Sequence, residues 1–146
     1  MKTKNPDYKA AVEHIFTAAN FIQHLGITFK DARPGYCEAE LELGSIHRQH
    51  LGRIHGGVIV TLAGHAATGA ATSLLAVDKA VVAMEYKISL LRAVAGERLF
   101  SRGQVLMAGS KSIFAEAEVF DGADATAKLV GKASFTFMVL DASVVA

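Results

Sequence analysis

The sequence predicts an α+β protein in which a curled antiparallel sheet wraps around one long central helix. Three observations support this prediction. One long apolar stretch lies in the middle of the chain, segments with alternating polar and apolar residues follow and precede it, and no repeat or linker divides the 146 residues. Because the only helix long enough to cover the buried face of a sheet is the central one, we expect a single domain spanning residues 1–146.

The N-terminal part, residues 1–24, is predicted to be a helical segment. Asn5 as N-cap and Pro6 in the first turn fit the usual signals of a helix start. Apolar residues then recur at spacings of three and four, at Ala11, Val12, Ile15, Phe16 and Ala19. A strand is expected at residues 25–31, followed by a turn at residues 33–35.

The strand with the clearest pattern covers residues 36–43. Glutamates alternate there with apolar residues, which is typical of an antiparallel strand with one buried face. A polar loop is expected at residues 45–54 and the central helix at residues 56–75. Four more strands are predicted at residues 81–91, 98–107, 113–120 and 128–139. Uncovered edge strands of such a sheet favour pairing with a second copy of the chain.

Composition excludes several classes of protein. Hydrophobic residues make up 51% of the chain, enough for a core, and a net charge of +1 without a basic block argues against nucleic-acid binding. The single cysteine, Cys37, and the polar N-terminus favour a reducing compartment, and we expect a cytoplasmic protein. Residues 58–76 are apolar but rich in Gly, Ala and Thr, and they include His65, so we interpret them as a helix buried in protein and expect no membrane segment.

Two glycines, Gly56 and Gly57, stand at the start of the central helix, directly after His55. The first N–H groups of a helix have no partner within the helix, and they lie at its positive end. Such donors can polarise a carbonyl group and stabilise an oxyanion. The alternative is a tight turn that requires glycine only for steric reasons.

Inside the central helix, the polar residues form one stripe: Thr61, His65, Thr68 and Thr72, with Gly64 beside it. A polar stripe on an apolar helix should face a cleft, water or a subunit interface, unless the threonines bond back to helix carbonyls. His65 is either a satisfied core or interface histidine or a general base. His47 and His50 lack a third ligand at a useful spacing, so no metal site is expected.

The segment Gln49-x-x-Gly52-x-x-His55-Gly56-Gly57, followed by Leu62-Ala63, resembles the hot-dog-fold thioesterase superfamily, and within it the subgroup named for phenylacetate degradation (PaaI-like). Residues 85–92, 109–112 and 135–137 are also similar to that subgroup. The resemblance covers roughly residues 20–140 and implies a hot-dog fold, in agreement with the prediction from the pattern.

The resemblance also implies an activity: hydrolysis of an acyl-CoA thioester without a cofactor. The apolar residues Val58, Ile59 and Leu62 and the strands after them suggest a hydrophobic acyl group, aliphatic or aromatic. By analogy, the Gly56 N–H holds the thioester carbonyl beside Gly57, His55 supports the loop or the carbonyl, Gln49 positions the carbonyl or the attacking water, and Thr68 helps to orient that water. Candidates for binding the CoA phosphates are basic residues that are otherwise ordinary solvated charges: Lys87, Arg92 and Lys111. The resemblance further implies a homodimer or a homotetramer (a dimer of dimers) with sites at the subunit interface.

One position departs from the family pattern. The catalytic Asp or Glu of the family lies nine residues after the motif histidine, and this chain has Gly64 there. A glycine can neither attack a thioester nor activate water. Three explanations remain open: the chain is a variant of an active enzyme, another group such as His65 or Glu85 substitutes, or the protein binds an acyl-CoA or related ligand with weak turnover or none.

Overall fold

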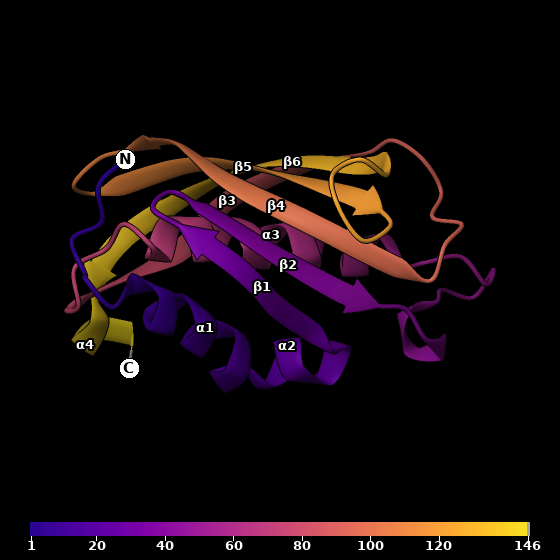
Figure 1. Cartoon of the computed structure of the whole chain (residues 1–146), viewed down its shortest axis with the longest axis horizontal. Coiled ribbons are helices and arrows are strands. Elements are labelled where there is room, and N and C mark those ends of the chain that lie inside the picture. Colours follow the sequence, from indigo (N-terminus) through magenta and orange to yellow (C-terminus); the bar gives the residue numbers. More distant parts are fainter. Residues whose placement is uncertain (146) are drawn as a thin grey trace.

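The computed structural model describes residues 1–145 and confirms the predicted architecture, a six-stranded antiparallel sheet curled around one long helix (Figure 1). The strand order is β1-β2-β4-β5-β6-β3, so β1 and β3 are the two edges of the sheet. The strands are β1 (Ile27–Arg33), β2 (Tyr36–Glu42), β3 (Lys79–Leu90), β4 (Arg98–Ala108), β5 (Ser112–Asp121) and β6 (Lys128–Asp141). The helices are α1 (Tyr8–Ala18), α2 (Asn20–Leu25), α3 (Gly56–Thr72) and α4 (Ala142–Val145), with a 3₁₀ turn, η1 (Ser45–His47).

Strand β2 shows why the alternating pattern predicted the sheet correctly. Cys37, Ala39 and Leu41 are buried toward α3, whereas Glu38 and Glu40 lie on the outer face. The strand pairs with β1 on one side and with β4 on the other, both antiparallel. Its register is therefore fixed by burial, because a slip of one residue would bury the glutamates.

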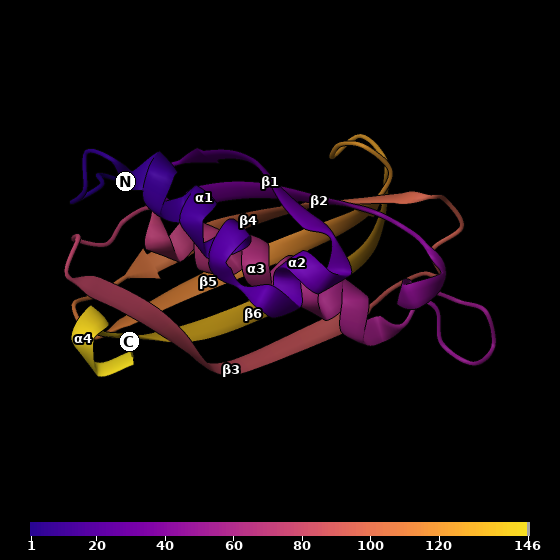
Figure 2. The same ribbon diagram turned by 90° about the horizontal axis from the view of Figure 1, so that it is seen from below.

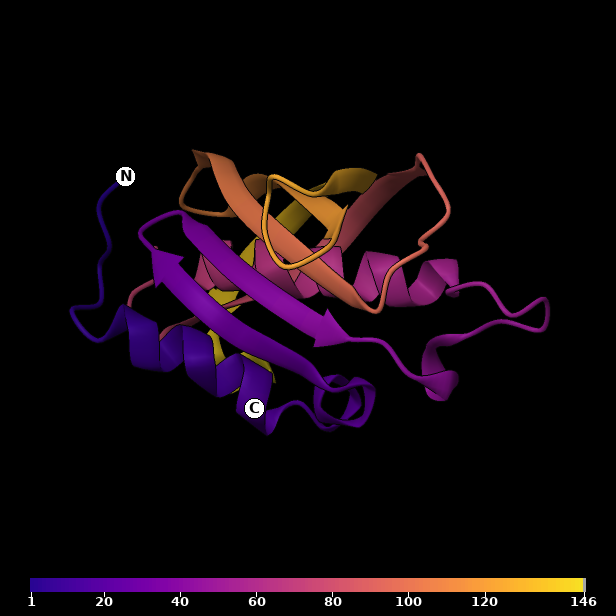
Figure 3. The ribbon, with the colours of Figure 1, turned by 45° about the vertical axis from the view of Figure 1, so that its right-hand side comes forward.

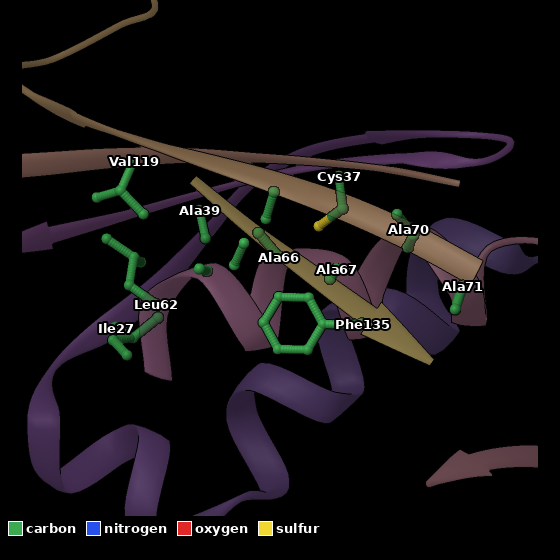
Figure 4. Packing of buried hydrophobic residues seen from close by; sticks show 14 of the residues in the cluster. Ile27, Cys37, Ala39, Leu62, Ala66, Ala67, Ala70, Ala71, Val119 and Phe135 are labelled. Carbon is green, nitrogen blue, oxygen red and sulfur yellow. The ribbon is translucent and has the colours of Figure 1, made fainter. Parts of the chain in front are cut away.

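Helix α3 lies close against the sheet because its sheet-facing residues are small. Figure 4 shows this packing, with Ala66, Ala67 and Ala70 of α3 beside Cys37 of β2 and Phe135 of β6. Strand β4 approaches so closely at Gly103 that a Cβ atom there would lie 2.4 Å from the carbonyl oxygen of Ala66. Only glycine is compatible with that contact, so the composition of both elements determines the spacing between them.

The N-terminal helices begin and end differently from the prediction. The Asn5 side chain accepts a hydrogen bond from the Asp7 N–H at 2.9 Å, which holds a turn around Pro6 and delays the helix start to Tyr8. Helix α2 runs to Leu25 and ends at Gly26, whose φ of 77° is left-handed. The strand predicted from residue 25 therefore begins at Ile27.

Helix α3 starts at Gly56 as predicted but ends at Thr72, three residues before the predicted end. Ser73 explains the early end. Its hydroxyl donates to the Ala70 carbonyl at 2.6 Å and accepts from the Gly35 N–H at 2.7 Å, so the buried side chain ties the helix end to the β1–β2 turn. This use of a serine near a helix end competes with continued helix.

The two sheet edges differ. Helix α1 lies beside β1 and buries Val12 and Phe16 against α3, whereas β3 lies at the opposite edge (Figure 2). Large apolar side chains of β3 are exposed there: Val82, Met84, Tyr86 and Leu90. Residues 1–145 contain no helix with the length and hydropathy needed to cross a bilayer.

Candidate active site at the start and middle of the central helix

The loop before α3 is a narrow excursion held at its base. Arg48 and Ile54 form an isolated antiparallel bridge, and the Gln49 N–H donates to the Arg53 carbonyl at 2.8 Å. The loop extends beyond the end of the sheet, as the right-hand side of Figure 3 shows. The chain re-enters the body at His55, directly before the helix.

His55 is the N-cap residue of α3. Its ring Nδ1 accepts a hydrogen bond from the Gly57 N–H at 2.8 Å, and its carbonyl accepts from the Val58 N–H at 3.0 Å. The Gly56 N–H has no acceptor among the described residues. The sequence predicted two backbone donors here. The Gly57 N–H is bonded to the His55 ring, and the Gly56 N–H is free to bind a ligand at the positive end of the helix.

Gly56 also lies in the wall of a pocket of about 320 Å³, which we call the helix-start pocket. A Cβ atom on Gly56 would lie 2.9 Å from Cδ1 of Leu90, so β3 approaches the helix start closely. The pocket is mostly apolar with two arginines, and its lining is Arg53, Ile54, Gly56, Ile59, Leu90, Leu91, Arg92, Ala93 and Val94. An apolar cleft with a free backbone donor and basic groups suits a hydrophobic ligand that carries a carbonyl and a negative charge.

A second pocket, of about 230 Å³, opens beside the middle of the helix, and we call it the mid-helix pocket. It brings Gly64, His65 and Thr68 together, and its full lining is Val60, Thr61, Gly64, His65, Thr68, Ala83, Tyr86, Phe135 and Phe137. Its aromatic wall is ordered by ring contacts, since Phe135 lies 5.8 Å from Tyr86 and 5.9 Å from Phe137 between ring centroids. Thr61, His65 and Thr68 of the predicted stripe therefore face a cleft, whereas Thr72 does not line it.

Two threonines of the stripe, Thr61 and Thr68, also bond back to the helix, so both alternatives hold for them. Thr61 donates to the Gly57 carbonyl at 2.7 Å, and Thr68 donates to the Gly64 carbonyl at 2.8 Å. The hydroxyl protons of Thr61 and Thr68 are therefore used in hydrogen bonds to the backbone. Each oxygen keeps its acceptor lone pairs, so Thr68 can accept a hydrogen bond from a water or ligand in the pocket.

His65 turns toward α1. Its Nε2 lies 3.1 Å from the Ile15 carbonyl oxygen, and its ring meets Phe16 edge-on at 4.5 Å. Because a carbonyl only accepts, Nε2 carries the proton and Nδ1 is left as an acceptor. Burial lowers the pKa of His65 below its ordinary value, although the hydrogen bond to Ile15 opposes this, so the ring is neutral at pH 7.

Gly64 leaves space that a carboxylate side chain would partly fill. A Cβ atom there would lie 3.2 Å from Cε1 and 3.5 Å from Cζ of Phe135. A side chain at this position therefore requires the Phe135 ring to move by a few tenths of an ångström, and it would then project into the mid-helix pocket.

The remaining sequence candidates are scattered. The Gln49 side chain accepts from the Leu51 N–H inside its own loop. Arg92 lines the helix-start pocket and donates to the Leu129 carbonyl at 2.8 Å. Lys87 is exposed on β3, opposite Ser134 of β6.

Lys111 lies far from Gly56 within one chain. It follows Gly109 and Ser110, which line a pocket with Leu74 and Leu75 just beyond the end of α3. The helix of 17 residues separates this turn from Gly56 by about 25 Å at 1.5 Å per residue.

Two wall residues were not identified from the sequence as site residues. Leu90 contacts the helix start, and Phe135 faces Gly64. Phe135 lies on the buried face of an alternating strand, whereas Leu90 is about half exposed at the end of β3. A pattern along one strand does not say which of its residues lies beside which turn of the helix.

Comparison with known proteins agrees with this geometry. A sequence model of the Thioesterase superfamily matches residues 51–128. A solved thioesterase family protein from Silicibacter pomeroyi is 26% identical over 92% of this chain and 98% of that chain, with a TM-score of 0.86. A conserved protein of Pseudomonas aeruginosa is 31% identical over 84% of this chain and 94% of that chain, with a TM-score of 0.78.

A thioesterase from Haemophilus influenzae, at 22% identity over 97% of this chain and 96% of that chain, shares the fold with a TM-score of 0.83. No curated protein sequence matches the chain. The family match covers more than half of the chain, including all of α3 and the helix-start glycines. The chain is therefore a member of the thioesterase superfamily with the hot-dog fold.

Proposed function

We propose that this protein binds and hydrolyses a hydrophobic acyl-CoA, and that it belongs to the PaaI-like subgroup that its motif resembles. The observation that carries the proposal is the free Gly56 N–H in the wall of the helix-start pocket. A developing oxyanion on the thioester carbonyl would be stabilised by this donor and by the positive end of α3. A cytoplasmic location, where Cys37 stays a buried thiol, fits this activity.

The helix-start pocket provides contacts for the rest of such a ligand. Ile59, Leu90 and Leu91 offer apolar surface for the acyl chain or the pantetheine arm. Arg53 and Arg92 lie in the same lining and can pair with phosphate oxygens. Arg92 is the better placed of the candidates from the sequence, since Lys111 lies at the other end of the helix.

One chain does not contain a complete site. Gly56 and Gly64 are eight residues apart, which is about 12 Å along a helix, so a carbonyl held at the first is out of reach of a base at the second. Pairing of two β3 edges around a two-fold axis would run the two α3 helices antiparallel, so that Gly56 of each copy lies nearer to the middle of the other helix. We therefore propose a homodimer, with a dimer of dimers as the homotetramer.

The exposed side chains of β3 support that pairing. Met84 and Tyr86 are 50% and 57% exposed, on a strand of 12 residues that ends the sheet. A long apolar edge strand without cover would aggregate in a monomer. Covering it with the same strand of a second copy removes the edge.

Gly64 makes the native chain a slow enzyme in this proposal. No carboxylate lines the mid-helix pocket, and His65 is held toward α1 by its contact with the Ile15 carbonyl. The second candidate function, binding of acyl-CoA without turnover, is favoured by the same observation. Both functions use the Gly56 N–H and the helix-start pocket.

The test is hydrolysis of aliphatic, phenylacetyl and benzoyl CoA esters by the native chain, Gly64→Asp and Gly64→Asn, followed as free thiol. The two variants place side chains of similar size beside Phe135, and only one supplies a carboxylate. We expect Gly64→Asp to exceed the native rate by about 10²–10⁴-fold, the range of a positioned general base, and Gly64→Asn to stay near the native rate. Binding of CoA esters without hydrolysis by any form would favour the binding role, and absence of both would refute the proposal.

A further inference from the structure

His47 is a buried polar residue that the proposed reaction does not use directly. Its side chain is 4% exposed, and it ends the 3₁₀ turn η1, between β2 and the loop that precedes α3. The sequence predicted only that it lies in the polar loop at residues 45–54. In the structure it connects three segments of the chain.

Both ring nitrogens of His47 bind backbone. Nδ1 accepts from the Gly44 N–H at 2.8 Å, and Nε2 lies 2.7 Å from the carbonyl oxygen of Leu25, the last residue of α2. A carbonyl can only accept, so Nε2 carries the proton and the ring is the neutral tautomer that satisfies both partners. Removal of the ring would leave the Gly44 N–H and the Leu25 carbonyl without these bonds.

The backbone of His47 continues the connection to the helix start. Its carbonyl accepts a hydrogen bond from the His55 N–H at 2.9 Å. The ring Nδ1 of His55 in turn accepts a hydrogen bond from the Gly57 N–H. The series therefore runs from the end of α2 through His47 and His55 to the first turn of α3. Gly56 therefore lies between two residues, His55 and Gly57, whose N–H groups are both hydrogen-bonded.

We propose that His47 is a positioning residue that fixes the free Gly56 N–H for the thioester carbonyl, and that through Leu25 it makes the N-terminal helices part of the site. This inference rests on the proposed function for the identity of the ligand. The role is one of positioning, because the His47 ring is buried and both of its nitrogens are occupied by Gly44 and Leu25. A preorganised donor is effective because it needs no rearrangement when charge develops.

Three full-length variants test the role. His47→Leu removes both ring contacts, whereas His47→Gln retains one acceptor and one donor on a neutral side chain. His24→Gln is the matched control, since His24 is an exposed histidine on α2 next to Leu25 whose side chain makes no hydrogen bond or ion pair among the described residues. Amide hydrogen exchange is measured at His55 and Gly57, and at Val119 in the core of β5.

We expect His47→Leu to speed exchange at His55 and Gly57 about tenfold or more, the worth of one hydrogen bond, with Val119 unchanged. His47→Gln should restore most of the protection, and His24→Gln should match the native chain. In the Gly64→Asp background, His47→Leu should lower kcat more than it raises KM. Native-like exchange in His47→Leu, or an equal increase at Val119, would overturn the positioning role. The exchange measurement needs no turnover, so a failure of hydrolysis in every form counts against the proposed function and not against His47.

Discussion

The start and the middle of α3 differ in the chemical groups that they offer for the proposed thioester hydrolysis. At the start, the His55 cap leaves the Gly56 N–H free beside an apolar pocket, where we propose that the carbonyl binds. In the middle, the hydroxyl of Thr68 and an aromatic wall are present around Gly64, but no carboxylate is. The proposed binding groups at the helix start are therefore fixed by the packing of helix and sheet, whereas a carboxylate at position 64 would require only a small movement of the Phe135 ring.

The largest effect is expected from removing the donor at the helix start. Gly56→Pro deletes the N–H, and proline suits the first position of a helix. In the Gly64→Asp chain, turnover of an acyl-CoA should fall by about 10²–10³-fold, the usual worth of one oxyanion donor. Gly56→Ala, which keeps the N–H but makes the same contact with Leu90, should lose much less. Equal losses of turnover in the two variants would show that the loss comes from the contact with Leu90 and not from the missing N–H.

The next effect concerns the edge that would join two half-sites. Met84→Lys places a charge on the exposed edge strand β3, where the two-fold axis would bring it near its own copy. The dimer should weaken by about a hundredfold or more in dissociation constant, because like charges in an interface cost several kcal/mol. Analytical ultracentrifugation gives the constant. Leu106→Lys on β4, a similarly exposed position away from that edge, is the control and should leave the dimer intact.

A smaller effect is expected inside the mid-helix pocket. Thr68→Val removes the oxygen that can accept a hydrogen bond from the attacking water, with little change of shape. Turnover of the Gly64→Asp chain should fall about tenfold, the worth of one hydrogen bond, and Thr68→Ser should retain most of it. Unchanged kinetics in Thr68→Val would limit this threonine to its bond with the Gly64 carbonyl.

The smallest effect is a pH dependence of stability. Burial lowers the pKa of His65, so below about pH 6.5 the unfolded chain binds a proton there that the folded chain does not. The free energy of unfolding should therefore fall as pH drops from 6.5 toward the lowered pKa, by at most about 1.4 kcal/mol per pH unit. Urea unfolding of His65→Gln, compared with the native chain at pH 7.5 and 5.5, should show a weaker loss on acidification. An identical pH dependence would mean that other groups cause it.

The fold was predictable because its signals are local. Alternation in residues 36–43 predicted the strand β2, and the Gly, Ala and Thr residues of the central stretch indicated a helix buried in protein. Errors occurred where one side chain decides an end. Ser73 stops α3, and Asn5 delays α1, through contacts that depend on the folded partner or on the geometry of a single turn.

The site was predictable only in part. The motif predicted His55 and Gly56 at a helix start. The hydrogen bond from the Gly57 N–H to the His55 ring depends on the rotamer of His55, which the motif does not specify. His65 is oriented by a carbonyl 50 positions earlier in the chain, and no spacing rule predicts that contact. The same holds for His47, whose partner Leu25 is 22 positions away.

Mixing of subunits tests whether the helix start of one copy and the helix middle of another form one site. One chain carries Gly56→Pro together with Gly64→Asp, and the other is native. Neither homodimer combines a donor with a carboxylate. After exchange of subunits, each mixed dimer has one complete site, so it should hydrolyse acyl-CoA at about half the rate of the Gly64→Asp homodimer. A mixture that contains mixed dimers and stays as slow as its components would show that the two copies do not share a site.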